Sequence, residues 1–270
     1  MNRVAHRTAG RLAPARPVVS SLRRGVGRDP ALVRTFGLRL GSGTIAPPRV
    51  EPWHQLVTAA SGRATVHTAA AAFPLPAGTG VWIPAHVPYR IALAGPAEVR
   101  LLYVRPCAES RAAAVPLEIT PLLAELIART IEHGALDARI PAQRRLAAVV
   151  ADEIAALHES TLAIPLPPRP GLARDAAIAL IADDARALGI EGVAALCGVS
   201  RRTLERAFAR ELGVGIAIWL RRLRFVDALH ALRAGSSVTD AAFDAGYAAP
   251  SAFIAAFKRE FLTTPRAFVR

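Results

Sequence analysis

Arginine side chains are concentrated in one short stretch of the chain. Between Ser200 and Arg224 there are seven arginines and only two acidic residues, Glu205 and Glu211. A guanidinium group stays charged near neutral pH, pairs with phosphate, and can donate two parallel hydrogen bonds to the edge of a guanine. The stretch therefore has the chemistry needed to bind nucleic acid, provided that a folded element presents these side chains together. An ordinary solvated helix face is the alternative interpretation.

The residues around these arginines have the spacing of a helix-turn-helix. Ala194 is small enough for two helices to cross there, and Gly198, four positions later, tolerates the positive φ of a tight turn. Ser200 is a residue type that caps helix N-termini. The apolar side chains expected on the inner faces are Val193, Leu196, Val199, Leu204 and Phe208. The second helix would then present to DNA the side chains of Arg201, Arg202, Thr203, Glu205, Arg206 and Arg210.

A second unit of the same kind follows an expected helix over residues 216–234. Ala242 and Gly246 repeat the spacing of Ala194 and Gly198, and the sequence of residues 257–260 resembles that of residues 208–211. The expected second helix of this unit exposes mostly small or apolar side chains. Ser251 and Lys258 are its candidates for phosphate contacts. Base recognition is therefore expected from the first unit, chiefly through Arg202, Glu205 and Arg206, with Arg210 nearer a phosphate.

The two units together resemble the DNA-binding domain of AraC/XylS-family transcription regulators. The resemblance covers residues 172–270, and the family pattern Gly-Tyr-x-x-x-Ser-x-Phe-x-x-x-Phe-Lys-x-x-Phe is present as residues 246–261. Leu262 departs from the pattern, which usually has glycine at this position, and this bears on how the last long helix ends. The resemblance implies a transcription regulator that binds double-stranded DNA and contacts RNA polymerase.

Residues 31–110 contain short apolar runs separated by glycine and proline, which is typical of antiparallel strands. Residues 53–56, 61–62 and 82–89 resemble the cupin-type sensor domain found in the same family. The expected fold class is α+β: an N-terminal cupin-like antiparallel β-barrel with flanking helices, then an all-α domain of two helix-turn-helix units joined by a linker helix. A small-molecule effector is expected inside the barrel, lined by His54, Trp82, His86 and Tyr89, although these side chains are equally suited to filling a core.

The histidines lack the spacing of a cupin metal site. His54, His67 and His86, with Glu51 nearby, do not form a converging ligand set, so we expect no metal, no cofactor and no catalytic residues. A metal-dependent cupin enzyme fused to a DNA-binding module is one alternative function. An architectural DNA binder without sequence preference is another. A DNA alkyl-repair protein, which needs an activated cysteine and a cysteine-rich zinc site, is rejected because Cys107 and Cys197 are the only cysteines.

The remaining segments complete the expected domain organisation. Residues 111–163 predict amphipathic helices that cover the barrel, pair two chains as a homodimer, or do both. Four prolines between positions 165 and 170 favour extended backbone and mark a linker over residues 164–171. Residues 1–30, with seven arginines and one aspartate, are expected to be a disordered basic tail; a basic arm for the minor groove and a transit-like leader are the alternatives.

Composition limits the class of protein. The chain has 270 residues, 52% of them hydrophobic, which excludes wholesale disorder. Its net charge is +13, with 33 arginines and a single lysine, Lys258, so a polyanionic partner is expected. The longest charge-free stretch, residues 64–89, is broken by four prolines, whereas a membrane-spanning helix needs roughly 20 continuous apolar residues. We therefore expect no membrane partner and a place in the bacterial cytoplasm, on the nucleoid.

Overall fold

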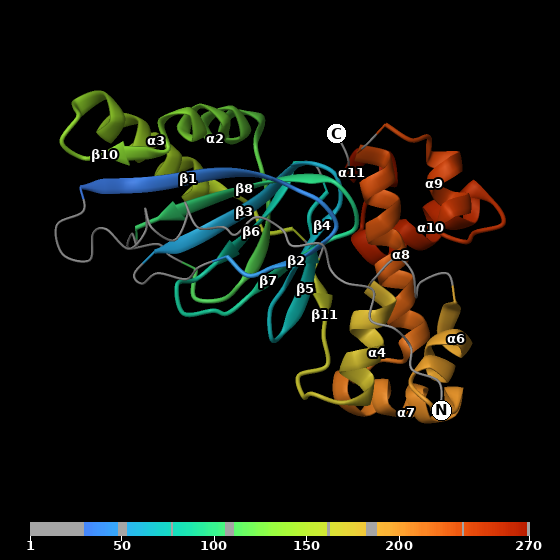
Figure 1. Ribbon diagram of the computed structural model, residues 1–270. Coiled ribbons are helices and arrows are strands. Elements are labelled where there is room, and N and C mark those ends of the chain that lie inside the picture. The colour runs from blue at the N-terminus through green and yellow to red at the C-terminus, as the bar shows by residue number, and fades with distance from the viewer. Residues whose placement is uncertain are drawn as a thin grey trace.

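The protein consists of a β-rich domain followed by a helical domain (Figure 1). The computed structural model describes residues 30–47, 53–76, 78–105, 111–160, 163–181, 188–233 and 235–268. The predicted basic tail, apart from Pro30, lies outside these residues, as do Glu51 and Cys107. No helix in the described ranges is both long and apolar enough to cross a membrane.

The β-rich domain contains two antiparallel sheets. The six-stranded sheet has the order β10-β1-β8-β3-β6-β9, formed by β1 (Ala31–Leu40), β3 (His54–Ser61), β6 (Thr79–Ile83), β8 (Ala97–Val104), β9 (Val115–Glu118) and β10 (Ala135–Asp137). The five-stranded sheet has the order β11-β5-β4-β7-β2, formed by β2 (Gly43–Ile45), β4 (Ala64–His67), β5 (Ala71–Pro74), β7 (Arg90–Leu93) and β11 (Ile164–Pro165). Alternate side chains of both sheets form one core, which includes Val57, Val66, Ile83, Ile91 and Leu101.

The antiparallel β-domain is confirmed, but the barrel is not closed. Among the described residues no strand of one sheet pairs with a strand of the other. Proline explains part of this, because it cannot donate a hydrogen bond to a neighbouring strand and is therefore found at sheet edges. Pro116 lies in the edge strand β9 and Pro165 lies in the edge strand β11. The architecture is therefore a sandwich of two sheets.

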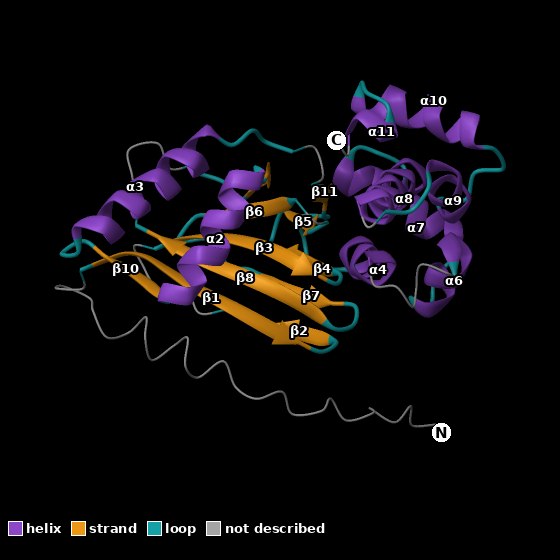
Figure 2. Ribbon diagram, turned by 90° about the horizontal axis from the view of Figure 1, so that it is seen from above, coloured by secondary structure: helices purple, strands orange, loops and turns teal. Residues whose placement is uncertain are grey.

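Two helices cover the outer face of the six-stranded sheet, as Figure 2 shows. They are α2 (Pro121–His133) and α3 (Pro141–Ala156). Thr120 caps α2 by accepting a hydrogen bond from the Leu123 N–H at 3.1 Å, and Pro141 is the first residue of α3, where proline is tolerated. Apolar residues of both helices pack on the sheet together with Leu56, Trp82 and Leu102. The helices therefore cover the sandwich, one of their two predicted roles.

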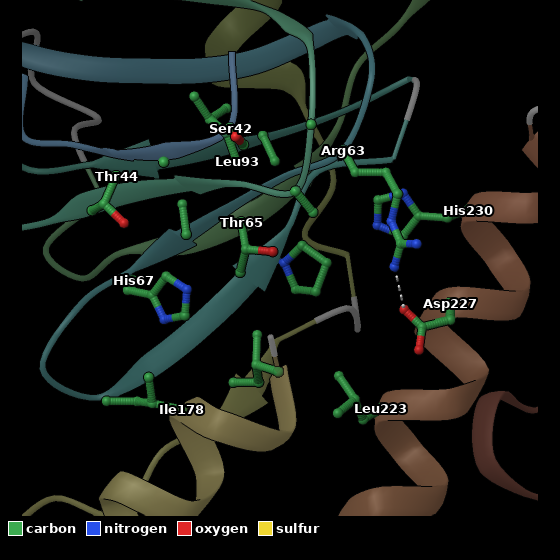
Figure 3. Close-up of a pocket in the computed structure, with 17 residues that line it drawn as sticks. Ser42, Thr44, Arg63, Thr65, His67, Leu93, Ile178, Leu223, Asp227 and His230 are labelled. Carbon is green, nitrogen blue, oxygen red and sulfur yellow. Dashed lines mark ion pairs between the residues drawn. The ribbon is translucent and has the colours of Figure 1, made fainter. Parts of the chain in front are cut away.

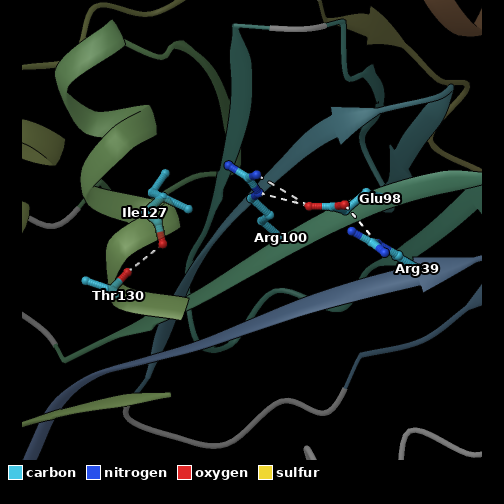
Figure 4. A network of polar contacts seen from close by, with 5 residues as sticks. All are labelled: Arg39, Glu98, Arg100, Ile127 and Thr130. Carbon is cyan, nitrogen blue, oxygen red and sulfur yellow. Dashed lines mark hydrogen bonds and ion pairs between the residues drawn. The ribbon is translucent and has the colours of Figure 1, made fainter. Parts of the chain in front are cut away.

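Polar contacts link β1 to β8 in the six-stranded sheet and stabilise α2, which covers that sheet (Figure 4). Glu98 on β8 binds Arg39 on β1, with 3.2 Å between Oε2 and Nε, and binds Arg100 at 3.4 Å. The hydrogen bond with Arg39 lowers the pKa of the Glu98 carboxyl. In α2, the buried Thr130 hydroxyl donates to the Ile127 carbonyl at 2.9 Å. The Thr130 carbonyl in turn accepts a hydrogen bond from the Thr35 hydroxyl on β1, so the helix is anchored to the sheet.

The proline-rich segment between the domains is attached at its first residues. Ile164 and Pro165 form β11 and pair with β5, and Leu166 is buried. The Trp219 indole N–H of the helical domain donates to the Pro165 carbonyl at 2.7 Å. This part of the predicted linker therefore contacts both domains.

The helical domain has the predicted arrangement of two helix-turn-helix units joined by a helix. Its described helices are α4 (Leu172–Ile181), α6 (Gly189–Leu196), α7 (Arg201–Leu212), α8 (Ile216–Arg233), α9 (Val238–Asp244), α10 (Pro250–Phe261) and α11 (Pro265–Phe268). Nine of the eighteen residues of the connecting helix α8 are buried. Its Phe225 ring lies 5.6 to 6.1 Å from four other aromatic rings, those of Tyr247, Phe253, Phe257 and Phe261. This aromatic cluster holds the second unit on α8.

Candidate nucleic-acid interface

The first helix-turn-helix unit consists of α6, a tight turn and α7. Gly198 in the turn has a φ of 67°, the left-handed conformation predicted for it. The Ser200 hydroxyl accepts a hydrogen bond from the Thr203 N–H at 3.2 Å and so caps α7. Ala194 is buried at the helix crossing. These three features place the start of α7 as the sequence predicts.

The prediction for Leu196 is wrong. Its side chain is 66% exposed, whereas Val193, Leu204 and Phe208 are fully buried. Residues four apart on a helix lie on one face, so the buried stripe of α6 continues from Val193 to Cys197, which packs against the core. Leu196 precedes Cys197 and therefore points away from the core.

The polar face of α7 carries all six residues predicted to contact DNA from this unit. Five of them are exposed and Glu205 is half-buried. Arg201 binds Glu205, with 2.7 Å between Nε and Oε1, and also binds Glu191 of α6. Arg201 and Glu205 therefore form an ion pair in the free protein, and Glu205 can contact a base only if this ion pair breaks. Within the described ranges, no ion pair involves Arg202 or Arg206.

The second unit, α9 and α10, presents a different surface. Gly246 has a φ of 83° in its turn, as predicted. On α10, Phe253 and Phe257 are buried, and the predicted residues Ser251 and Lys258 are exposed. Ala252 and Ala255 share the exposed face, which therefore has few hydrogen-bonding groups in its first turns.

Sequence reasoning missed several residues of this domain. Ser237 caps α9 by accepting a hydrogen bond from the Asp240 N–H at 3.1 Å, and a serine three residues before an aspartate was an available signal. Arg259 is exposed beside Lys258 on α10. Arg224 on α8, the last of the seven arginines that the sequence groups together, lies against the second turn, because a Cβ built on Gly246 would be 3.4 Å from its guanidinium. These groups add positive charge near the second unit.

The four residues predicted to line an effector site do not share one cavity. His54 stacks on Trp82 at 5.2 Å and accepts a hydrogen bond from the Ala85 N–H. Burial, and then the nearby His86, lower the pKa of His54. Trp82 faces the helices α2 and α3, whereas Tyr89 lies between the two sheets, where its hydroxyl donates to Gln55. His86 is exposed. His54, Trp82 and His86 therefore lie close together, whereas Tyr89 is separated from them by the six-stranded sheet.

Among the described residues, no group of three or more histidine, cysteine, aspartate or glutamate side chains is placed to hold an ion. His67 lies on the outer face of the five-stranded sheet, away from His54. Burial, followed by the charges of Arg90 and Arg174, lowers the pKa of His67 to about 4.

Comparisons with known proteins agree with this arrangement. Residues 13–183 match the family model of an AraC-binding-like domain, and residues 193–270 match that of a helix-turn-helix domain. The transcriptional regulator NimR of Escherichia coli is 28% identical over 217 residues, which cover 80% of this chain and 79% of NimR. The transcriptional activator RhaS of Escherichia fergusonii is 40% identical over 83 residues, 30% of each chain. The structure of ToxT from Vibrio cholerae is 10% identical, with a TM-score of 0.34 over 88% of this chain and 97% of ToxT. Since the AraC-binding-like model alone spans more than half of the chain, the protein belongs to the AraC family of helix-turn-helix transcription regulators.

Proposed function

We propose that this regulator recognises its operator mainly through α7, while α10 holds the DNA through phosphate contacts. The observation that carries the proposal is the difference between the two exposed faces. The α7 face carries Arg202, Arg206 and Arg210, whereas the first turns of α10 expose Ser251 and alanines. Guanidinium groups distinguish guanine in the major groove, while alanine methyl groups only make apolar contacts with thymine.

Position along α7 supports separate roles for its arginines. Arg206 lies in the middle of the helix between the buried residues Leu204 and Phe208, so its side chain projects away from the domain. Arg210 lies one turn later and binds Glu211 at 3.2 Å. Residues nearer the N-terminal part of a recognition helix contact base edges more often. We therefore assign base contacts to Arg202 and Arg206, and phosphate contacts to Arg210, Ser251 and Lys258.

We propose that the β-rich domain pairs two copies of the chain and responds to an effector. Leu122 on α2 is 53% exposed and Val149 on α3 is 44% exposed, which supports a homodimer interface on these helices. We further propose that this domain responds to a small-molecule effector, that the bound regulator contacts RNA polymerase, and that it acts on the nucleoid in the bacterial cytoplasm. The relatives named above are transcriptional regulators, which favours this function over that of an enzyme or an architectural DNA binder.

Binding-site selection from random DNA duplexes with the full chain would test the proposal. We expect a defined motif, and affinities for that motif and its single-base variants can then be measured by fluorescence anisotropy. Arg206→Ala should weaken binding about tenfold or more, since a bidentate guanine contact is worth roughly 1–3 kcal/mol, and should relax preference at one base position. Arg39→Ala is the matched control, because Arg39 is an exposed arginine of β1, in the other domain and outside the two helices proposed for pairing.

Two results would contradict the proposal. Enrichment of no motif would indicate binding without sequence preference. An Arg206→Ala variant that weakens every duplex equally would show that Arg206 contacts phosphate instead of a base.

A further inference from the structure

Two sides of the connecting helix α8 have different surroundings. Leu223 and Asp227 face the β-rich domain, where they line a cavity of about 520 Å³ against the five-stranded sheet (Figure 3). Asp227 binds Arg63 of the turn between β3 and β4, with 3.5 Å between Oδ1 and Nη2. Since 3.6 residues make one turn of an α-helix, Arg224 is rotated by about 100° from Leu223 and Arg221 by about 160°. Both arginines therefore lie on sides of α8 that do not face the β-rich domain.

These two arginines lie beside the turn of the second helix-turn-helix unit. The Arg224 guanidinium is 3.4 Å from a Cβ built on Gly246, the residue with positive φ in that turn. Burial raises the pKa of the hydroxyl of the next residue, Tyr247, and the positive charges of Arg221, Arg224 and Arg259 oppose this rise. The three guanidinium groups therefore lie around one point of the surface, and we call them the basic cluster.

The ion pair next to the basic cluster leaves its charge uncompensated. Arg222 of α8 binds Glu260 of α10, with 3.8 Å between Nη1 and Oε1, which brings the preceding residues of the two helices, Arg221 and Arg259, near one another. Glu260 is the one carboxylate that acts on the Tyr247 hydroxyl, and it is already paired.

The basic cluster itself is exposed. In the part of the chain that the structure describes, no ion pair involves Arg221, Arg224 or Arg259, and all three side chains are exposed to solvent. Like charges held close together repel one another, so an anion with several charges is the partner that this surface favours.

We propose that Arg221, Arg224 and Arg259 bind consecutive phosphates of the DNA backbone, between the two segments of the operator that α7 and α10 contact. The inference rests on the proposed function, because it requires both helix-turn-helix units on one duplex. In a helix-turn-helix the second helix enters the major groove while the first crosses the backbone, so the turn between them lies close to phosphates. A planar guanidinium donates two parallel hydrogen bonds to a phosphate.

The connecting helix then has a role beyond joining the two units. Its arginines add affinity on the side of the second unit, where the first turns of α10 expose few hydrogen-bonding groups. Phosphate contacts fix the position of a protein on the duplex and carry no sequence information of their own. The basic cluster would therefore fix where α10 lies on the DNA without adding base preference.

The test uses the full chain and the duplex obtained by binding-site selection, with affinity measured by fluorescence anisotropy at several salt concentrations. Arg221→Gln and Arg224→Gln should each weaken binding to the motif and to its single-base variants alike, by about three- to tenfold. Each should also reduce the slope of log affinity against log salt by about one unit. Arg224→Lys keeps the charge and should keep the wild-type slope. Arg39→Gln, on β1, is the matched control and should bind like the wild type.

Duplexes that carry a single methylphosphonate separate a direct contact from damage to the turn beside Arg224. A methylphosphonate lacks the charge of one phosphate, and one is placed at each backbone position in turn. We expect a position between the two contacted segments at which this change weakens the wild type about three- to tenfold but leaves the affinity of Arg224→Gln unchanged. A variant that is merely misfolded would lose the same factor as the wild type at every position.

The inference is overturned if Arg221→Gln and Arg224→Gln bind like the wild type, if either changes base preference, or if no methylphosphonate position distinguishes Arg224→Gln from the wild type. Arg206→Ala is measured in parallel. A selected motif and an altered base preference in Arg206→Ala, together with any of these results, overturn this inference alone. Enrichment of no motif overturns the proposed function and this inference with it.

Discussion

Replacing Leu262 with glycine is expected to stabilise the helical domain. Leu262 ends α10 in the left-handed conformation, with a φ of 58° and a ψ of 12°, and its N–H donates to the Lys258 carbonyl at 2.9 Å. This conformation costs a residue with a side chain about 1–2 kcal/mol. The side chain is 88% exposed, so removing it exposes almost no buried apolar surface. Glycine loses more backbone entropy on folding, by about 0.5–1 kcal/mol, and the expected net gain is about 0.5–1 kcal/mol.

The reciprocal change provides a matched control. Gly213 ends α7 with a φ of 70° and a ψ of 0°, and its N–H donates to the Ala209 carbonyl at 3.0 Å. No described atom lies within 4 Å of a Cβ built there, so Gly213→Leu tests the backbone cost without a clash. We expect it to lower the free energy of unfolding by about 0.5–1 kcal/mol.

Urea unfolding followed by far-UV circular dichroism measures both changes. The expected gain for Leu262→Gly corresponds to a rise in Tm of about 1–4 °C. If Leu262→Gly lowers the free energy of unfolding while Gly213→Leu leaves it unchanged, the helix end is not under the backbone strain inferred from its φ, and the reasoning is refuted.

Three further outcomes are expected. Arg210→Ala should weaken binding to all duplexes alike and reduce the slope of log affinity against log salt by about one unit, measured by anisotropy at several salt concentrations. An altered base preference would argue against a phosphate contact. Val149→Asp should shift the full chain from dimer to monomer in analytical ultracentrifugation, and a dimer of unchanged affinity would place the interface elsewhere. In the unfolded chain His67 binds a proton once the pH falls below its usual pKa of 6.5, whereas in the folded chain its pKa is lowered to about 4. Between these two values the unfolded chain binds more protons than the folded chain, so the free energy of unfolding falls as the pH drops through this range. The loss between pH 7 and pH 5 should be about 1–2 kcal/mol, since solvent screens the site in part, and urea unfolding of His67→Gln should show a smaller loss.

The helix-turn-helix geometry could be predicted because its determinants are local. Gly198 and Gly246 adopt the positive φ that their position in a turn requires, and Ser200 caps the helix that it precedes. Each of these depends on a few neighbouring residues. Leu262 follows the same rule, since it adopts the left-handed conformation that glycine usually supplies at that position.

The features that sequence reasoning missed depend on contacts between distant residues. Trp82 and Tyr89 were grouped because both are aromatic and close in sequence, but β6 turns the Trp82 side chain toward α2 while Tyr89 packs between the sheets. Whether strands close into a barrel depends on pairings that the alternation within one strand does not reveal. The Arg63–Asp227 ion pair and the cavity beside it join segments of two domains, and no local pattern indicates them.

The single lysine has a practical consequence. Lys258 is exposed on α10, so an amine-selective reagent has one side-chain target in the whole protein, next to the DNA surface proposed here. A fluorophore attached to its Nζ would report on the second unit alone, without any engineered cysteine. Enzymatic or chemical acetylation would likewise neutralise a charge on the second unit and leave the guanidinium groups of α7 intact, since acylation of this kind does not modify arginine.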